Sequence, residues 1–330
     1  MLKTHSNRFL LILIGLFAGS SFSLLQAQSG YRPHPFLSPM WQADVEYLPA
    51  TQIEDTSLSN GFTGANFTLR IPIWKKKDWL DANGGKPFFA VMSHVGASAR
   101  MSQISFLDPD RLLTVGRASV TGLMAKGLRN LYVGQIGIAL PTESFYFNPA
   151  YLCFNGSLIW RHLYHNNRWW HTLGIVYLPI QGRDLPLPVA GIGVKLSNEN
   201  QLQLTFPFNL MYTHTFSRKF SLSGKLHNFG GYNYLKADTV HDVQPLAYRY
   251  NYRKLSLIAR YYTDRFVVLT GEAGVTGKSN ISLDDVDYHQ ASTFYLKFSI
   301  QVRFGERPTA APILNFDPGD SGFDPNYIVE

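Results

Sequence analysis

Four polar residues near the middle of the chain are of the types that hydrolytic chemistry uses. His214, Ser221, Ser223 and His227 lie in one predicted hairpin. A nucleophile needs a base within hydrogen-bond reach and a third group that orients that base. Their spacing shows no such arrangement, and strand alternation puts both serines and His227 on the polar face, where no catalytic role is needed. We therefore assign no catalytic residue, and lipid hydrolysis stays an alternative function.

Two acidic runs carry the oxygen ligands that Ca²⁺ prefers. One is Asp284-Asp285-Val286-Asp287 followed by His289, and the other spans residues 317–324. A calcium loop places its oxygen ligands at alternate positions around a glycine turn, and neither run fits that pattern. The single Cys153 can form neither an internal disulfide nor a thiolate zinc site. We expect solvated acidic loops, no metal site and no cofactor.

Basic side chains recur on the polar faces of the predicted strands. In a closed barrel these faces would border an aqueous interior, and a basic lining would favour anions if the pore is open. The candidate lumen-lining residues are Arg70, Arg100, Arg161, Lys225, Arg260, Lys297 and Arg303.

The strand that displays this arrangement most clearly spans residues 291–304. Its side chains alternate between an apolar and a polar face, which is the period of a β-strand. The polar face carries Lys297 and Arg303, while the other is apolar throughout and rich in Phe, as expected of a wall between lipid and water. The candidate lipid-facing residues are Phe294, Leu296, Phe298, Ile300, Val302 and Phe304.

Similar strands recur along the chain and are joined by turns that alternate between short and long, the outer-membrane pattern. The predicted tight turns are residues 127–130, 165–168, 197–200, 217–219 and 263–265, and the predicted long loops are residues 141–150, 179–188, 229–245 and 277–290. Pro72 should lie at a strand end or a bulge, because it lacks a backbone donor. If Pro207 divides residues 201–216 into two strands, the count is 14, and otherwise it is 12. Trp160, Trp169 and Trp170 cluster near one tight turn, either as an interfacial girdle or as packing within a hairpin.

Composition and the chain ends agree with an exported barrel. Aromatic residues make up 14% of the chain and charged residues only 16%, well below the usual quarter. Residues 1–27 have the basic start, short apolar core and small-residue end of a cleaved signal peptide. We expect an irregular lead-in over residues 28–40, a barrel over 41–304 and a flexible tail over 305–330. The formal charge of +7 is scattered and indicates no nucleic-acid partner.

One segment resembles a known family. Residues 187–234 combine a Gly-rich strand, a polar turn, the Phe206-Pro207 pair and an aromatic hairpin, and the signal ends in Ala27-Gln28. In these features the chain resembles a family of uncharacterised outer-membrane β-barrel proteins of Bacteroidota. The resemblance implies a location and a fold, and it supplies no catalytic or ligand-binding residues.

These observations predict an all-β protein, a transmembrane antiparallel up-and-down β-barrel of 12–14 strands in the outer membrane. Its expected partners are the lipid bilayer and the barrel-assembly machinery. The leading functional hypothesis is a pore or passive transporter for small solutes, with a preference for anions. The alternatives are a closed barrel that serves as scaffold or assembly partner of an export machine, a lipid hydrolase, and a soluble exported β-sandwich.

Overall fold

The computed structural model of the chain describes residues 40–54, 56–57, 59–78, 89–104, 112–126, 129–144, 147–164, 168–180, 183–206, 209–217, 219–235, 247–263, 267–283 and 286–303. For residues 74–78, 89–104, 125–126, 178–180, 183–185, 229 and 303 it describes the backbone alone. These residues all belong to one compact unit. The predicted signal peptide, the lead-in before Met40, Phe304 and the predicted tail lie outside the described residues.

The described residues are almost entirely β-strands. A 3₁₀ turn, η1 (Pro149–Tyr151), interrupts them, and within the described part of the chain no helix is long and apolar enough to cross a membrane. The strands are β1 (Met40–Gln52), β2 (Ser59–Asp78), β3 (Phe89–Ile104), β4 (Leu112–Lys126), β5 (Asn130–Glu143), β6 (Cys153–Leu163), β7 (Trp169–Ile180), β8 (Arg183–Lys195), β9 (Asn200–Phe206), β10 (Asn209–Thr215), β11 (Phe220–Tyr234), β12 (Ala247–Tyr262), β13 (Val267–Thr276), β14 (Ser279–Leu283), β15 (Val286–Gln290) and β16 (Phe294–Arg303).

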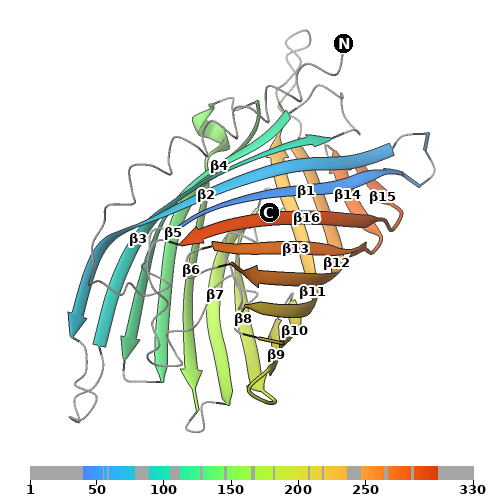
Figure 1. Cartoon of the computed structure of the whole chain (residues 1–330). Coiled ribbons are helices and arrows are strands. Elements are labelled where there is room, and N and C mark those ends of the chain that lie inside the picture. Colours follow the sequence, from blue (N-terminus) through green and yellow to red (C-terminus); the bar gives the residue numbers. More distant parts are fainter. Residues whose placement is uncertain are drawn as a thin grey trace. The chain divides into compact units, whose positions relative to one another are not determined.

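The strands form a closed antiparallel ring. Each of β1 to β13 pairs with its neighbour in sequence, and β16 pairs with both β13 and β1 (Figure 1). Of the sixteen strands, all but β14 and β15 belong to this ring, which therefore has fourteen members. Closure leaves no edge strand in the ring, as a backbone crossing hydrocarbon requires. The chain is thus a transmembrane up-and-down β-barrel, and the soluble sandwich alternative is wrong because no second stacked sheet exists among the described strands.

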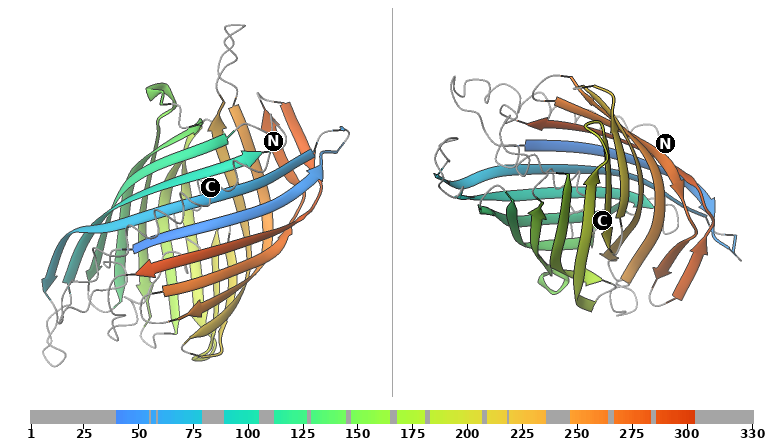
Figure 2. Two further views of the ribbon diagram at one scale, coloured as in Figure 1. Left: turned by 45° about the horizontal axis from the view of Figure 1, so that its top comes forward. Right: turned by 90° about the horizontal axis from the view of Figure 1, so that it is seen from below.

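The ring narrows at the end that carries the connections β5–β6 and β11–β12, which we call the loop end. The opposite end, which carries the tight turns such as β4–β5 and β8–β9, we call the short-turn end. At the loop end, β5 and β11 extend beyond the shorter strands β9 and β10 (Figure 2). Tyr234 of β11 forms a parallel bridge with Thr142 of β5. This bridge closes a smaller circuit of nine strands that leaves out β6 to β10. The β14–β15 hairpin pairs with β12 at the same end, and Gln290 also bridges to Ile53 after β1.

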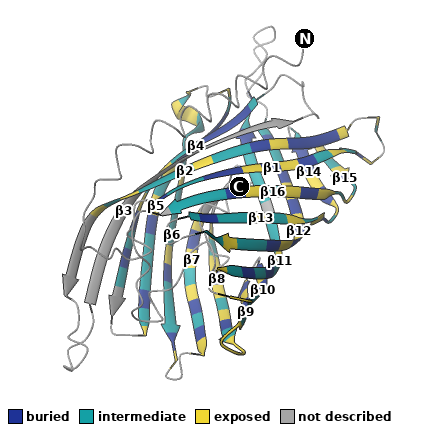
Figure 3. Cartoon of the chain, viewed as in Figure 1, coloured by how far each residue is buried: buried dark blue, intermediate teal, exposed yellow. Residues whose placement is uncertain are grey.

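Burial along the strands is the reverse of that in a soluble protein. Large apolar side chains lie exposed on the outer face, while polar side chains on the inner face are buried (Figure 3). On β16, Phe294, Leu296 and Phe298 are 50–54% exposed, whereas Tyr295 and Ser299 on the opposite face are 1% and 7% exposed. Apolar side chains facing outward and polar ones facing inward are the signature of a wall in contact with lipid.

The strand count expected from the sequence is confirmed at its upper value. Strand β9 ends at Phe206 and β10 begins at Asn209, so residues 201–216 do form two strands. The pairing of β2 with β3 shifts register between Pro72 and Trp74, as expected of a proline that cannot donate to the ladder.

Three of the four predicted long loops contain strand residues that were not expected. The segments 179–188, 229–245 and 277–290 were read as loops, yet β8 begins at Arg183, β11 runs to Tyr234, and β14 and β15 occupy most of the last segment. These extensions do not show an apolar face toward lipid, which was the pattern used to recognise strands. They pair all the same, because the neighbouring strands supply their backbone partners.

Candidate functional site

Strand β12 changes the polarity of its faces along its length. In its second half, Leu255 and Leu257 are more than half exposed on the outer face, while Lys254 and Ser256 are buried on the inner face. In its first half the arrangement is reversed, with buried inner Tyr248, Tyr250 and Tyr252 and polar outer Arg249, Asn251 and Arg253. An apolar exterior suits hydrocarbon, whereas a polar exterior over an apolar interior suits water. The membrane boundary therefore crosses β12 between Arg253 and Leu255.

Five of the seven candidate lumen-lining residues have described side chains, and all five share the inner face. Lys297 pairs with Glu46 and Glu272, and Lys225 pairs with the buried Met211 and Ser256. Strand register places Arg70, Arg161 and Arg260 on the same face. For Arg100 and Arg303 the structure describes the backbone alone, and their pairing partners are Asn66 and Met40.

Of the six candidate lipid-facing residues, five are described, and all five lie on the outer face of β16. Phe294, Leu296 and Phe298 are exposed, and Ile300 and Val302 are half-buried. Phe304 lies outside the described residues.

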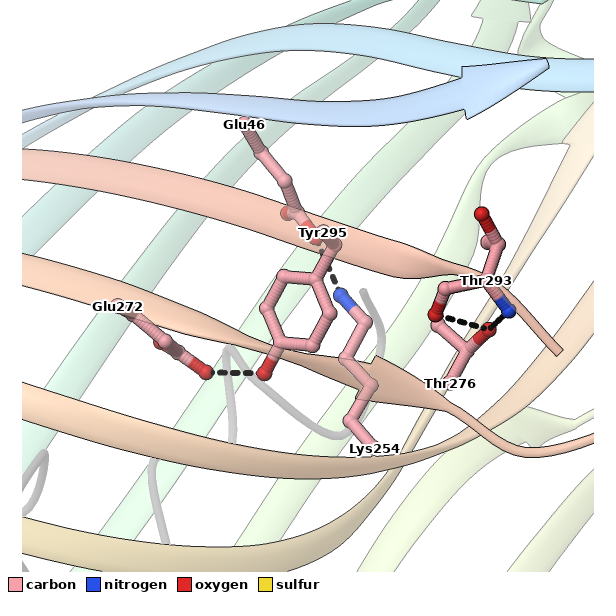
Figure 4. A network of polar contacts seen from close by, with 6 residues as sticks. All are labelled: Glu46, Lys254, Glu272, Thr276, Thr293 and Tyr295. Carbon is pink, nitrogen blue, oxygen red and sulfur yellow. Dashed lines mark hydrogen bonds and ion pairs between the residues drawn. The ribbon is translucent and has the colours of Figure 1, made fainter.

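Buried charges meet on the inner wall just inside the membrane boundary. Lys254 of β12 reaches over β13 and β16 to form an ion pair with Glu46 of β1 (Figure 4), and their side chains are 4% and 8% exposed. The Lys254 ammonium also lies 4.4 Å from the ring centroid of Tyr295, whose hydroxyl donates to Glu272 Oε1 over 2.5 Å. A buried charge is tolerated only when paired in this way, so these contacts hold β1, β12, β13 and β16 together from the inside.

A glycine makes room for the tyrosine in this network. Gly274 pairs directly with Tyr295, and a Cβ atom at position 274 would lie 2.8 Å from Tyr295 Cε1. The ring therefore lies flat against the wall, between the lysine ammonium and Glu272. The same arrangement recurs nearer the loop end, where a Cβ atom on Gly231 would overlap the ring of its partner Tyr250.

Above this network the interior holds a packed apolar core. We call it the loop-end core, and its central side chains, Ile53, Leu235 and Ile281, are 0% exposed. Such burial excludes water, so a solute moving along the barrel axis would meet close-packed side chains at this end. The remaining buried members are Leu48, Phe62, Leu113, Tyr248, Tyr250, Tyr252 and Tyr295.

A pair of buried amides ties the β14–β15 hairpin to the loop-end core. Asn60 Nδ2 donates to Gln290 Oε1 (3.1 Å), and Gln290 Nε2 donates to the backbone oxygen of Asn60 (2.7 Å). Asn60 Nδ2 also approaches the Tyr252 hydroxyl at 3.4 Å. Since both amides are 0% exposed, releasing the hairpin would leave buried polar groups without partners. The hairpin is thus a fixed part of the closure.

The inner face is predominantly basic. Asp44 is already engaged by Gln42 and Asn66, with donor–acceptor distances of 2.8 Å and 3.0 Å. Among the described inner-face side chains, the cations Arg70, Arg117, Arg161, Lys195, Lys225, Lys254, Arg260 and Lys297 outnumber the acids Asp44, Glu46, Glu143 and Glu272. Cations therefore exceed acids two to one among these described inner-face side chains.

The hydrolytic candidates are not brought together. Ser223 contacts Thr213 through their hydroxyls at 2.9 Å, and register places Ser221 and His227 on the inner face with it. His214 lies on the outer face, with Nδ1 2.7 Å from Asn200 Oδ1. His227 Nδ1 is buried without a hydrogen-bond partner, so these described side chains do not form the hydrogen-bonded pair that a nucleophile and its base require.

The remaining sequence candidates separate as well. Asp284, Asp285 and the run 317–324 lie outside the described residues, while Asp287 is exposed and His289 contacts Asn280. Among the described residues, no group of three His, Cys, Asp or Glu side chains is placed to hold a metal ion. Trp170 is buried on the inner face, so the interpretation of all three tryptophans as a girdle is wrong for this one.

Sequence reasoning missed the residues that organise the interior. Lys254 and Glu272 lie on the consecutive strands β12 and β13, and only ring closure brings Glu46 of β1 to them. The alternation of Tyr248, Tyr250 and Tyr252 was a usable signal, because three aromatic residues at a period of two predict a strand.

Comparisons with known proteins concern the fold alone. No family model matches the sequence, and neither does any curated protein. Among solved structures, an outer membrane channel from Pseudomonas putida F1 aligns over 84% of this chain and 100% of its own, with 8% identity and a TM-score of 0.36. The P. putida toluene transporter TodX aligns over 82% and 91%, with 7% identity and a TM-score of 0.24. The transport unit of the Escherichia coli autotransporter AIDA-I aligns over 86% and 94%, with 9% identity and a TM-score of 0.26. Likenesses this distant carry no information about function.

Proposed function

We propose that this chain is an outer-membrane barrel that admits small solutes, anions in preference, and whose loop end is closed in the conformation described here. The observation that carries the proposal is the change of polarity along β12. It divides the barrel into a lipid-embedded part with a basic interior and a water-exposed part that encloses the loop-end core. The first part suits a solute chamber, and the second acts as its closure.

The location in the outer membrane rests on the barrel wall together with the signal-peptide pattern of residues 1–27. Closed β-barrels cross membranes because every backbone group in the ring finds a partner. The proposal includes export of the chain through its cleaved signal peptide and insertion into the outer membrane by the barrel-assembly machinery. Fractionation with membranes and heat-modifiable gel mobility of the mature chain test both points.

Anion preference follows from the excess of inner-face cations. A solute entering from the short-turn end would meet Arg260 and then Lys225 before it reached the buried Lys254–Glu46 pair, beside which lies Lys297, the cross-strand partner of Glu46. Low-dielectric walls strengthen the field of such charges, which concentrates anions and repels cations. The excess of inner-face cations and the loop-end core together restrict which solutes can pass. The inner-face acids would weaken the preference for anions.

Planar-bilayer recording of the full mature chain tests the proposal. Under a salt gradient we expect low conductance from the wild type and a larger, anion-selective conductance from Leu235→Ala/Tyr250→Ala, which thins the loop-end core. Tyr261→Ala is the matched control, because this tyrosine lies on the same strand as Tyr250 but faces outward, 45% exposed. It should leave the conductance unchanged. A cation-selective current would refute the anion preference.

A second candidate function is a closed barrel that serves as scaffold or assembly partner. The parallel bridge between Tyr234 and Thr142 and the loop-end core favour it, because both close the barrel rather than open it. If the core-thinned variant folds yet conducts no better than the wild type, the scaffold function is supported instead. Crosslinking in cells that finds a partner other than a second copy would then identify what it assembles with.

A further inference from the structure

An asparagine at the start of one strand holds a histidine at the end of the next. Asn130 is the first residue of β5, and its Oδ1 accepts from Trp160 Nε1 (3.1 Å) and lies 2.9 Å from His162 Nδ1. His162 is the next-to-last residue of β6, and its ring meets that of Tyr164 edge-on at 5.2 Å between centroids. All four side chains share the outer face at the short-turn end of the barrel.

The same construction recurs on β9 and β10. Asn200 is the first residue of β9, and its Oδ1 accepts from the Tyr212 hydroxyl (2.6 Å) and lies 2.7 Å from His214 Nδ1. His214 is the next-to-last residue of β10 and meets Phe216 edge-on at 4.3 Å. We call these two groups the Asn–His stations. In both, the strand reads aromatic-x-His-x-aromatic, and the asparagine begins the preceding strand.

The asparagine fixes which nitrogen of each histidine carries the proton. An amide oxygen only accepts hydrogen bonds, so the contact requires a proton on Nδ1 of His162 and of His214. Nε2 lies on the opposite side of the imidazole ring and is left for a ligand. When Nε2 is also protonated, the ring becomes a cation that donates a charge-assisted hydrogen bond.

The surroundings of the stations select an anion held at a membrane surface. Tyr164, Tyr212 and Phe216 are 43–60% exposed beside the histidines, and aromatic side chains of this kind collect at the membrane–water boundary. The adjacent short turns carry exposed cations, namely Arg129, Arg168 and Lys219, whereas the exposed acid Glu199 accepts from Ser197 Oγ at 2.9 Å. Aromatic rings thus face the acyl chains while positive charge faces the headgroups.

We propose that each Asn–His station binds the phosphate of a bilayer phospholipid. The histidine Nε2–H donates to a phosphate oxygen, the asparagine positions the ring, and the exposed aromatic side chain packs against the glycerol and the first methylenes. This inference rests on the proposed insertion of the chain into a membrane. Two such contacts, four strands apart on one rim, would fix the height of the barrel in the bilayer.

Native mass spectrometry of the full mature chain in detergent tests the proposal with two probes. Phosphatidylglycerol supplies the phosphate, and digalactosyldiacylglycerol supplies similar acyl chains without phosphate or charge. His162→Phe/His214→Phe keeps the ring volume and removes the nitrogens, and we expect about tenfold weaker phosphatidylglycerol binding, the size of a charge-assisted bond. His289→Phe is the matched control, because its Nδ1 contacts Asn280 Oδ1 (3.0 Å) at the loop end. It should bind as the wild type does.

A second variant guards against loss of folding in the first. Asn130→Ala/Asn200→Ala leaves both histidines in place, and ¹⁵N spectra should show the loss of the Nδ1–H tautomer together with weaker phosphatidylglycerol binding. Unchanged binding in the histidine double variant would overturn the inference, as would equal affinity for the glycolipid. Wild-type chain that needs no detergent and shows no heat-modifiable mobility would instead refute membrane insertion. The two failures are therefore distinguishable.

Discussion

The Lys254–Glu46 ion pair offers a sharp test of how the inner wall is held together. The perturbation is Glu46→Ala, which leaves the lysine buried without its carboxylate. The two side chains are 4% and 8% exposed, so water cannot replace the lost partner. Breaking a buried pair from one side costs about 3–5 kcal/mol.

Neighbouring groups set where in that range the effect falls. The Lys254 ammonium, 4.4 Å from the Tyr295 ring centroid, keeps this cation–π contact when Glu46 is removed, so the lysine is not left wholly without stabilisation. We therefore expect Glu46→Ala to lower the free energy of unfolding by about 3 kcal/mol, the low end of the range. Replacing both partners, in Glu46→Leu/Lys254→Met, removes the buried charges together and should cost less than about 1 kcal/mol.

Guanidinium unfolding of barrels in lipid vesicles, followed by tryptophan fluorescence and by heat-modifiable mobility, measures these differences. Lys278→Ala is the control, because it breaks the exposed Lys278–Glu54 pair (2.7 Å), whose side chains are 74% and 37% exposed. It should leave the unfolding midpoint unchanged. If the double replacement proves as destabilising as Glu46→Ala, the reasoning fails, because the loss would then come from packing and not from an unpaired charge.

Three further outcomes follow from the same structure. Gly274→Val should destabilise the barrel by about 2 kcal/mol in the same unfolding assay, because its side chain would overlap both the Leu255 backbone oxygen and the Tyr295 ring, and an unchanged midpoint would contradict that overlap. Gln290→Ala should lower the free energy of unfolding by about 1–3 kcal/mol and raise planar-bilayer conductance, because it removes the buried partner of Asn60. Unchanged stability and unchanged conductance would contradict the role of Gln290 in closing the loop end. The hydrogen bond from Lys278 lowers the pKa of Glu54 from its usual 4.5. The pair therefore contributes its full stabilisation of the β14–β15 hairpin above pH 4.5, and this stabilisation is lost as the pH falls through the lowered pKa of Glu54. Amide exchange in β14 and β15 should then speed up only in strong acid, and equal acceleration in Lys278→Ala would contradict the link.

Much of the fold follows from local patterns in the sequence. The unbroken alternation over residues 291–304 predicts a two-faced strand, and the structure shows its apolar row facing outward. Pro207 predicts the break between β9 and β10, and with it the fourteen-membered ring. Pro72 predicts the irregular pairing of β2 with β3. Each of these is a property of a few consecutive residues, which is why the sequence alone reveals it.

The interior was harder to predict because it depends on contacts between distant strands. Lys254 and Glu46 are separated by 208 positions in the chain, and no local pattern links them. The basic residues expected to line an open pore do share the inner face, but the same face becomes an apolar core toward the loop end. A rule that every inner residue is polar fails there, since that part of the barrel stands outside the lipid.

By itself, the sequence determined that the chain alternates polar and apolar residues along many short strands, because side-chain direction in a strand has a period of two. It also determined where prolines and polar turns interrupt the strands. Only the tertiary structure decided which residues of different strands share a height in the ring. That registry places three tyrosines of β12 in a closed core, pairs a buried lysine with a glutamate across two strands, and sets two histidines at matching positions on the rim. The physical reason is that closure of the ring fixes all strand registers together, and no single strand carries that information.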